Sequence, residues 1–253
     1  MLGFALLGLV LAQSAFANGA ESAYQKALKE FSGKRDFSKI EKWLIQAASE
    51  EHRKAQSALA FYYTYRSSNE KKALSYHYKA ADNECMESSY WLAHRALQNN
   101  QPSEFYRRFK QGLTRATSCY EVHSHAFPVS IVSKMHRMVE EMYGVIDKAA
   151  QEPNPRDQFL LGVIYFQGYK AQGIPDFKTG VLWLEKAAQQ NHVLAQFTLA
   201  SVYTTDITGT ENRALARHWI KEAYQRRNHD SLTEEEKQKI IKLYQCIHSK
   251  TEC

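Results

Sequence analysis

The feature that most constrains the fold is a short pattern that recurs along the chain. The segments AQSALAFYY (55–63) and AQFTLASVY (195–203) share the first Ala and Gln, a Leu-Ala pair and the final Tyr. Two further segments keep the core of this pattern, YWLAHRA at 90–96 and FLLGVIY at 159–165. A fixed repeat length of this kind is typical of chains built from one supersecondary unit stacked on copies of itself.

A pair of small residues recurs with the same period. Ala80-Ala81 follows Ala47-Ala48 after 33 residues, Ala187-Ala188 repeats the pair, and Glu222-Ala223 is a partial copy. The period of the whole pattern is 33 to 38 residues. Leu and Tyr at positions i and i+4 share one face of a helix, and a small residue beside them admits a neighbouring backbone. Neither helix of such a unit buries its apolar face alone, so the units must stack.

The sequence therefore predicts an all-α protein of α-solenoid class, a superhelical array of antiparallel helix pairs. Apolar residues spaced for one helix face, together with the capping and breaking residues between them, place the predicted helices. Their ranges are 20–31, 38–50, 53–66, 70–82, 86–98, 103–117, 129–150, 156–168, 176–190, 192–205, 211–227 and 233–248. No segment predicts a β-strand.

Within this array, residues 156–227 resemble the Sel-one-like repeat, a relative of the tetratricopeptide repeat with a glycine-containing loop between its two helices. The residues that carry the resemblance are Leu161, Gly162 and Tyr165 in the first helix, Gly168 and Gly173 in the loop, Asp176 before the second helix, and Trp183, Lys186, Ala187 and Ala188 within it. The resemblance implies an interaction scaffold and not an enzyme.

The repeats divide the chain into five parts. Residues 1–17 are predicted to be a signal peptide, and residues 18–118 hold tetratricopeptide-like or Sel-one-like repeats without the glycine loop. Residues 119–155 fit the pattern poorly, as a degenerate repeat or an interruption, and residues 156–227 hold the clearest repeats. Residues 228–253 are expected to form a polar capping helix and tail, started by a Thr233 and Glu236 capping box.

The first 17 residues, MLGFALLGLVLAQSAFA, carry no charge and end in the small-x-small triplet Ala15-Phe16-Ala17. This pattern is typical of a secretory signal peptide with its cleavage site, although a basic residue is missing from its start. The apolar run breaks at Gln13, short of the roughly 20 residues needed to cross a bilayer. We therefore expect an exported, periplasmic or secreted protein that does not span the membrane after cleavage.

The four cysteines, Cys85, Cys119, Cys246 and Cys253, are an even number in a chain expected to enter an oxidising compartment. Two disulfides are predicted, and three connectivities are open; the preferred one joins Cys85 to Cys119 and Cys246 to Cys253. The second bridge requires the last helix to end near His248, because seven helical residues would hold its cysteines about 10.5 Å apart. No C-x-x-C pair indicates a zinc site.

The formal net charge of +6 favours an acidic partner. For an exported protein we expect an acidic effector protein or an envelope component, and no nucleic acid. The densest basic cluster is Arg107, Arg108, Lys110 and Arg115, which is equally consistent with a solvated helix face. No metal or cofactor is predicted, because His123, His125 and His136 lie in the segment that fits the repeat poorly and the side chains of His123 and His125 would diverge on a helix.

Catalytic motifs are weak. Ser68-Asn69-Glu70-Lys71 fits the S-x-x-K pattern of serine acyl-enzymes, and some exported relatives in the resembled family have been linked to penicillin binding. The tetrapeptide falls in a predicted turn, however, and neither S-D-N nor K-T-G occurs. The chain is therefore predicted to be non-enzymatic, with an acyl-enzyme as the least favoured alternative.

The resemblance to tetratricopeptide-type solenoids implies a concave groove lined by set positions of each first helix. In each first helix these positions lie two residues before the repeated Leu, two residues after it and five residues after it. The side chains at these positions supply the predicted partner-binding set. That set is Phe61, Tyr90, His94, Phe159, Phe166, Phe197 and Thr204. Exposed aromatic residues are typical of binding surfaces, although a tight superhelix would instead bury these rings between repeats.

The leading functional hypothesis is an exported adaptor that binds a protein partner in this groove and scaffolds envelope or surface machinery. The alternative is a periplasmic immunity protein that occludes a secreted antibacterial effector. The family resemblance implies both roles, whereas the residues themselves predict only stacked helices with aromatic side chains at the groove positions.

Overall fold

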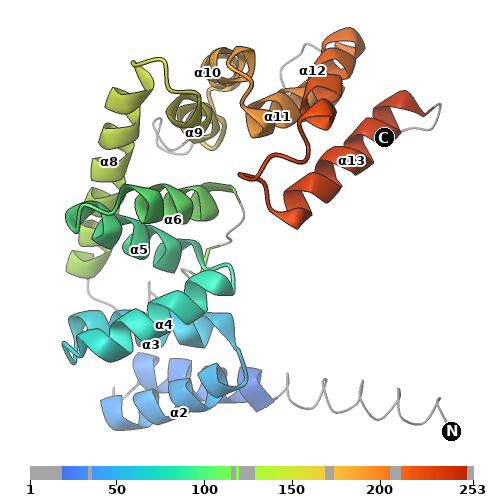
Figure 1. Cartoon of the computed structure of the whole chain (residues 1–253). Coiled ribbons are helices and arrows are strands. Elements are labelled where there is room, and N and C mark those ends of the chain that lie inside the picture. The colour runs from blue at the N-terminus through green and yellow to red at the C-terminus, as the bar shows by residue number, and fades with distance from the viewer. Residues whose placement is uncertain are drawn as a thin grey trace, which may run out of the picture. The chain divides into compact units, whose positions relative to one another are not determined.

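A computed structural model describes residues 19–33, 36–114, 118–119, 129–168, 174–205 and 212–249 of the chain, with the side chains of 129–132 excepted (Figure 1). Residues 19–32 are helical, and the other helices are α2 (Phe37–Ser49), α3 (Arg53–Tyr65), α4 (Glu70–Asp82), α5 (Met86–Gln98), α6 (Pro102–Thr114), α8 (Val129–Ala150), α9 (Pro155–Phe166), α10 (Phe177–Gln189), α11 (Val193–Thr204), α12 (Arg213–Gln225) and α13 (Glu234–His248). The all-α prediction is confirmed, and no β-strand lies among these residues. The predicted signal peptide, 1–17, lies outside them. None of the described helices is both long and apolar enough to span a membrane.

Side-chain caps begin most of these helices. Asp36, Asn69, Asp176 and Asn212 each accept a hydrogen bond from a backbone N–H of the first turn, which would otherwise lack a partner. The predicted capping box of α13 is present in both directions between Thr233 and Glu236. The sequence therefore fixes most helix starts locally.

One tight turn joins the end of several helices to the start of the next. At its centre a residue adopts positive φ, as at Glu51, Glu84, Asn100 and Asn191. The N–H of the following residue then donates to a carbonyl five residues back, as from His192 to Ala187. This is the Schellman arrangement, which satisfies carbonyls at the helix end. Because the turn has a fixed length, the helices that end in it are joined to the next helix in the same way.

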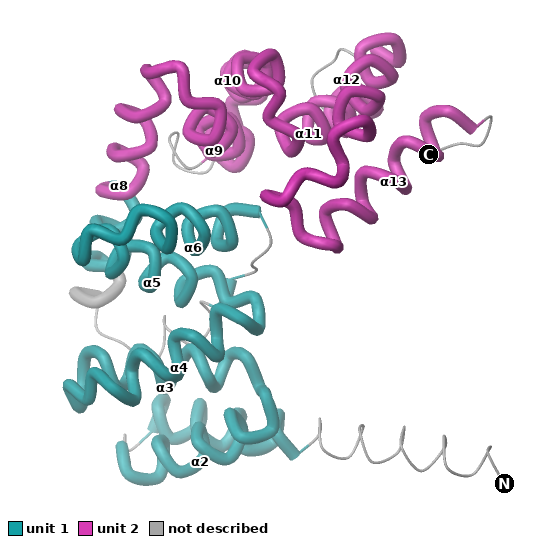
Figure 2. Tube along the Cα trace, viewed as in Figure 1, with its two compact units in different colours: residues 1–140 teal, residues 141–253 magenta. Residues whose placement is uncertain are grey.

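The chain divides into two compact units, residues 1–140 and 141–253 (Figure 2). In the first unit the contacts run from α2 to α3, α4, α5 and α6 in chain order. In the second unit they run likewise from α9 through α10, α11 and α12 to α13. Each unit is therefore a stack of helices in which sequence neighbours are also neighbours in space, as a solenoid requires.

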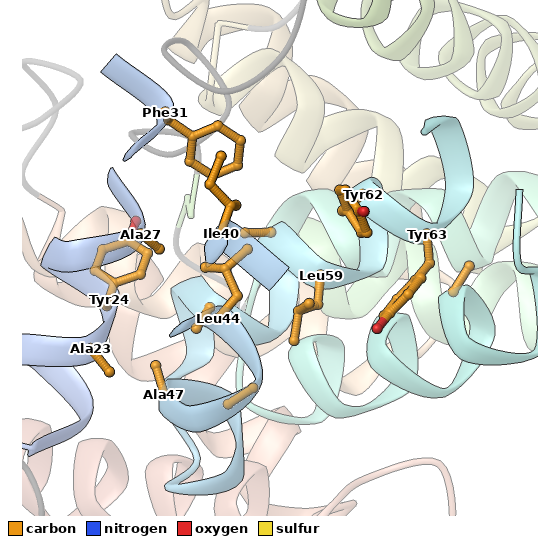
Figure 3. Close-up of a cluster of buried hydrophobic side chains, with 14 residues drawn as sticks. Ala23, Tyr24, Ala27, Phe31, Ile40, Leu44, Ala47, Leu59, Tyr62 and Tyr63 are labelled. Atoms are coloured by element: carbon orange, nitrogen blue, oxygen red, sulfur yellow. The ribbon is translucent and has the colours of Figure 1, made fainter. Parts of the chain in front are cut away.

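The first unit has a continuous core where residues 19–32, α2 and α3 meet (Figure 3). Ile40 and Leu44 of α2 are fully buried, and they lie with Leu59 of α3 in the same cluster. The small pair Ala47-Ala48 is buried in this cluster too. The predicted role of the small pair in close helix packing is therefore confirmed.

In the second unit, α9 and α10 cross at two glycines. A Cβ added at Gly162 would lie 2.8 Å from Leu184 Cγ, and one added at Gly180 would lie 3.1 Å from the carbonyl oxygen of Gly162. Both distances are shorter than ordinary van der Waals contact. The prediction that a small residue at Gly162 admits the neighbouring helix is therefore confirmed.

The segment that joins the second helix of one repeat to the first helix of the next repeat occurs twice with a shared sequence pattern, 140 residues apart. We call it the duplicated junction. Residues 43–63 and 183–203 share the pattern W-L-x-x-A-A-x-x-x-H-x-x-A-Q-x-x-L-A-x-x-Y. The two histidines, His52 and His192, cap α3 and α11 through Nδ1, which accepts from the backbone N–H three residues on. The two glutamines, Gln56 and Gln196, donate to the carbonyls of Ala48 and Ala188. The shared residues therefore serve the same structural purpose in each unit.

The Cys85–Cys119 disulfide is confirmed, with the Cα atoms 5.6 Å apart. Cys85 occupies the start of α5, where the equivalent residue of the duplicated junction is a capping histidine. The buried Glu87 side chain accepts from the backbone N–H of Cys119 at 2.9 Å and from the Ser118 hydroxyl. Cys246 is also disulfide-bonded, and its predicted partner Cys253 lies outside the described residues.

Candidate functional site

The structure separates the seven predicted groove residues into two groups. Phe61 is 0% exposed and Tyr90 and Phe159 are each 3% exposed, so these three rings offer no surface to a partner. His94, Phe166, Phe197 and Thr204 are half-buried. The predicted groove assignment is therefore corrected for the first three residues.

Phe61 is buried because its ring belongs to an aromatic stack inside the first unit. The ring of His77, from α4, meets it edge-on with centroids 4.8 Å apart. On its other side His77 stacks on Trp91 of α5 at 3.9 Å. Phe61 therefore packs between helices. This agrees with the alternative interpretation of the groove positions, in which a tight superhelix buries these rings between repeats.

His77 was missed at the sequence level, although it is fully buried and bonded at both ring nitrogens. The Thr64 hydroxyl donates to the Ala60 carbonyl at 2.8 Å, so its oxygen accepts from His77 Nε2 at 3.1 Å. Nδ1 lies 3.2 Å from Ser88 Oγ, and with Nε2 protonated it accepts from that hydroxyl. Nothing in the sequence around YHYKAA distinguishes this histidine, because its partners come from two other helices.

Tyr90 and Phe159 are buried for different reasons. Tyr90 lies over Gly112 of α6, where an added Cβ would come within 2.7 Å of its ring. Phe159 stacks on the capping histidine His192 with centroids 4.7 Å apart. Both rings therefore occupy spaces that the repeat leaves between neighbouring helices.

Phe166 is half-buried at the end of α9. Its ring covers Gly180 of α10, and its Cε2 atom would lie 2.7 Å from a Cβ added at that glycine. The ring also contacts that of Phe177, with the two centroids 5.4 Å apart. The missing side chain at Gly180 thus creates the space for this ring. Part of the Phe166 side chain remains accessible, but most of its contacts are internal.

His94 lies on α5 beside residues that the sequence analysis did not assign. Trp91, His94 and Arg95 are all half-buried and, at positions i, i+3 and i+4, they share one face of the helix. The Arg95 guanidinium pairs with the Glu70 carboxylate at 2.7 Å and lies 5.8 Å from the Trp91 ring. Arg95 on this face is therefore already paired with a surface carboxylate of the same chain.

Phe197 and Thr204 lie together on a half-buried stripe of α11. Positions i, i+4 and i+7 place Phe197, Ser201 and Thr204 on one face, with the half-buried Thr198 at its side. We call these four residues the α11 face. The sequence of α11, VLAQFTLASVYT, holds no charged residue, so the face is free of charge on its own helix.

The hydroxyl groups of the α11 face are already bonded to the helix backbone. Thr198 Oγ1 donates to the Leu194 carbonyl at 2.7 Å, Ser201 Oγ to Phe197 at 3.1 Å, and Thr204 Oγ1 to Ser201 at 2.7 Å. Each donor is thus satisfied before any partner binds, while the methyl groups of the threonines and the ring of Phe197 remain available. A partner that covers this face leaves no hydroxyl donor unbonded.

The duplicated junction carries a small residue at the position equivalent to Phe197. The equivalent residue 140 positions earlier is Ser57, and that serine is 0% exposed in the same helical context. Phe197, by contrast, is half-buried. Tyr90 and Phe159 hold the same position of their repeats as buried rings, so Phe197 is the one of these four side chains that is only half-buried.

The structure gives little support to an acyl-enzyme serine or a metal site. Ser68 lies in an exposed turn between α3 and α4 at a positive φ of 50°, not at a buried helix start. Among the described residues no three His, Cys, Asp or Glu side chains are arranged to hold a metal ion. His123 and His125 lie outside those residues, and His136 is exposed on α8.

The helix crossings, the turns at helix ends and the side-chain caps recur along the chain. Together they define a helix-pair repeat protein of the solenoid class. The family model for the Sel1 repeat matches residues 53–85, 155–192 and 193–228, which correspond to the pairs α3 with α4, α9 with α10, and α11 with α12. The chain thus contains three Sel1 repeats, and repeats of this kind typically mediate protein–protein interaction.

Two solved structures are similar to this chain at low identity. A Sel1 repeat protein from Oxalobacter formigenes is 17% identical, with 81% of this chain and 59% of that chain covered and a TM-score of 0.35. A protective antigen of uropathogenic Escherichia coli strains that displays an SLR fold is 18% identical, with 94% and 47% covered and a TM-score of 0.35. The chain thus spans about half the length of these two structures. The search of the curated proteins found no match.

Proposed function

We propose that this chain is an exported, non-enzymatic adaptor that binds a protein partner on the α11 face. The observation that carries the proposal is Phe197, the half-buried member of a repeat position that elsewhere holds a buried serine, Ser57, or a buried ring, Tyr90 or Phe159. Aromatic residues surrounded by uncharged, internally satisfied groups are typical of the centre of a protein interface. The role as an interaction scaffold agrees with the family.

Export is proposed from the leader-like pattern of residues 1–17 and is supported by the disulfide chemistry. Cys85 and Cys119 form a disulfide, and Cys246 is bonded as well. Structural disulfides persist in oxidising compartments such as the periplasm and are rare in the cytosol. The partner is therefore expected in the envelope or outside the cell.

The test replaces Phe197 by the serine that the equivalent position already accepts. Full-length wild type and Phe197→Ser are expressed from the natural leader, cross-linked in the envelope and purified, and the captured proteins are quantified by mass spectrometry. The matched control is Leu182→Ser on α10, which removes an apolar side chain that is 54% exposed. Circular dichroism spectra confirm equal helicity before capture is compared.

We expect Phe197→Ser to lose at least about tenfold of a specific partner, because a central aromatic side chain contributes about 2 kcal/mol or more to such interfaces. Leu182→Ser should retain that partner. Equal capture by all three proteins would show that the α11 face is not the binding surface. If the partner is a toxic secreted effector, protection on co-expression in the same compartment would favour the immunity role over scaffolding.

A further inference from the structure

The exposed side of α12 carries a cluster of basic residues. Residues 213–227 hold five Arg or Lys side chains and one Glu, a formal charge of +4 in a chain of +6. Ala216, Ile220 and Ala223 are buried on the other side of this helix, and the helix contacts α11 and α13. Residues at positions i, i+3, i+4, i+7 and i+11 share one side of a helix. We call the exposed side the α12 face, and its members, all exposed, are Ala214, Arg217, His218, Lys221 and Gln225.

The charges of the α12 face are not neutralised within the described part of the chain. The side chains of Arg217 and Lys221 form no ion pair and no hydrogen bond with the residues that the structure describes. The one acidic residue of α12, Glu222, is held by Arg226 at 2.8 Å. The α12 face therefore presents its positive charge to its surroundings.

Basic side chains on two other helices are paired. Lys237 and Lys239 of α13 pair with Glu234 and Glu235, each at 2.6 Å. The densest basic cluster of the sequence is paired in the same way, because its two adjacent arginines on α6 both bond to Glu104. Pairs at i, i+3 and i, i+4 of this kind support a helix from its own surface. The basic residues of α13 and α6 therefore have a structural explanation within the chain.

The same explanation does not apply to α12. No acidic residue stands three or four positions before or after Arg217 or Lys221. These two residues are themselves four positions apart, as are Arg213 and Arg217, and like charges at this spacing destabilise a helix slightly. The arrangement is thus one that folding alone does not favour, which points to a ligand that supplies the negative charge.

We propose that the α12 face binds an anionic membrane surface. The centre of a protein interface is depleted of Lys and is built on apolar or aromatic side chains, whereas the α12 face has exposed cations at its centre. A layer of anionic headgroups needs only cations that reach it, and it attracts each Lys or Arg without a fixed geometry. Leu215, which is 37% exposed, and the half-buried Trp219 each follow a member of the face by one position, and such side chains enter the interfacial region of a bilayer. The chain is then a peripheral membrane protein, attached through α12.

The experiment is co-sedimentation of the purified full-length chain with vesicles of phosphatidylglycerol and phosphatidylcholine in equal parts. Vesicles of phosphatidylcholine alone report any binding that does not depend on charge. Wild type is compared with Arg217→Gln combined with Lys221→Gln, and with Lys237→Gln combined with Lys239→Gln, which removes the same charge from α13. A fourth protein, Arg217→Lys combined with Lys221→Arg, keeps the charge and changes its geometry. Circular dichroism confirms equal helicity, and the two α12 positions are exposed, so their substitution removes no buried contact.

We expect the double Gln variant of α12 to bind the anionic vesicles about tenfold or more weakly than wild type, because each Lys or Arg at such a surface contributes about fivefold. The α13 control and the exchanged variant should bind as wild type does, and high salt should weaken all binding. Equal binding by wild type and the α12 Gln variant, or an equal loss in the α13 control, would overturn the proposal. Wild type that binds soluble polyglutamate through α12 but not the vesicles would assign this face to an acidic protein instead. None of these results bears on partner binding by the α11 face.

Discussion

The side-chain amide of Gln190 donates to the side-chain carbonyl oxygen of Gln158 at 2.7 Å and so joins α10 to α9. Gln158 in turn donates to the carbonyl of Ala150 at 3.4 Å. The same two links occur in the first unit, where Asn83 donates to Gln56 at 2.8 Å and Gln56 donates to Ala48. At these two sites, Gln56 and Gln158, a buried glutamine thus connects its helix to the one before and to the end of the one after.

This ladder is incomplete at α11. Gln196 donates to Ala188, but its buried Oε1 has no hydrogen-bond partner among the described residues. The position that supplies the donor elsewhere is Arg226, which instead pairs with Glu222. We expect Arg226→Gln to complete the ladder and stabilise the fold by about 1 kcal/mol, because a satisfied buried carbonyl outweighs a partly exposed ion pair.

Thermal unfolding followed by circular dichroism tests this prediction. A gain of about 1 kcal/mol corresponds to a rise of about 2–4 °C for a chain of this size. Arg227→Gln, one residue further on, removes the same charge at a position that does not correspond to the donor of the ladder, and it serves as the control. A melting temperature for Arg226→Gln at or below that of the control would contradict the ladder.

The Cys85–Cys119 disulfide is expected to be a major contributor to the stability of the first unit. It closes a loop of 34 residues, for which the entropy removed from the unfolded chain amounts to about 3–4 kcal/mol. Cys85→Ser with Cys119→Ser should lower the free energy of unfolding by that order, as measured by urea denaturation. Glu87→Gln, which keeps the bridge but weakens the bonds to Ser118 and Cys119, should cost less. A double cysteine variant as stable as wild type would show that the disulfide adds nothing.

The crossing of α9 and α10 predicts an unusual response to alanine. In most helices Gly→Ala stabilises by about 0.5–1 kcal/mol. At Gly180 the added Cβ would lie 2.7 Å from Phe166 Cε2 and 3.1 Å from the Gly162 carbonyl, so overpacking of about 1–3 kcal/mol should outweigh that gain. Gly180→Ala should therefore destabilise the protein in chemical denaturation.

A double-mutant cycle identifies the cause. Phe166→Leu removes the ring that occupies the space above Gly180, so Gly180→Ala should cost less in that background. Equal costs in both backgrounds would assign the strain to the Gly162 carbonyl alone. The cycle also measures how far Phe166 acts as a packing residue, which its contacts with Gly180 and Phe177 indicate.

The sequence predicted the helices and their stacking well, because both depend on local and periodic signals. The small pairs, the Leu-Ala pair and the caps occur at fixed spacings, and each acts within its own helix or on the next one. Ala47-Ala48 and Gly162 accordingly pack as predicted. The Cys85 and Cys119 pairing was also predicted, although not by elimination of the alternatives.

Exposure of the groove residues could not be predicted in the same way, because it depends on partners from other helices. Phe61 is covered by His77, and Tyr90 fills the space over Gly112, contacts that no spacing within one helix encodes. Ser57 and Phe197 occupy equivalent positions with different exposure. Only the structure, in which the two junctions can be compared, distinguishes a fully buried side chain from a half-buried one at these positions.

The last prediction concerns Tyr203, whose hydroxyl donates to Glu185 at 2.8 Å. Burial, followed by this hydrogen bond and the charge of Glu185, raises the pKa of Tyr203 to about 12. An ordinary tyrosine ionises near 10, so the stabilisation from the neutral hydroxyl is complete below about pH 10 and is lost as the pH approaches 12. Spectrophotometric titration of the phenolate should therefore show a late-ionising group that Tyr203→Phe removes. Glu185→Gln should move that group to lower pH without removing it, because burial persists while the carboxylate charge is gone; an unchanged titration in Glu185→Gln would mean that the carboxylate contributes nothing to the shift.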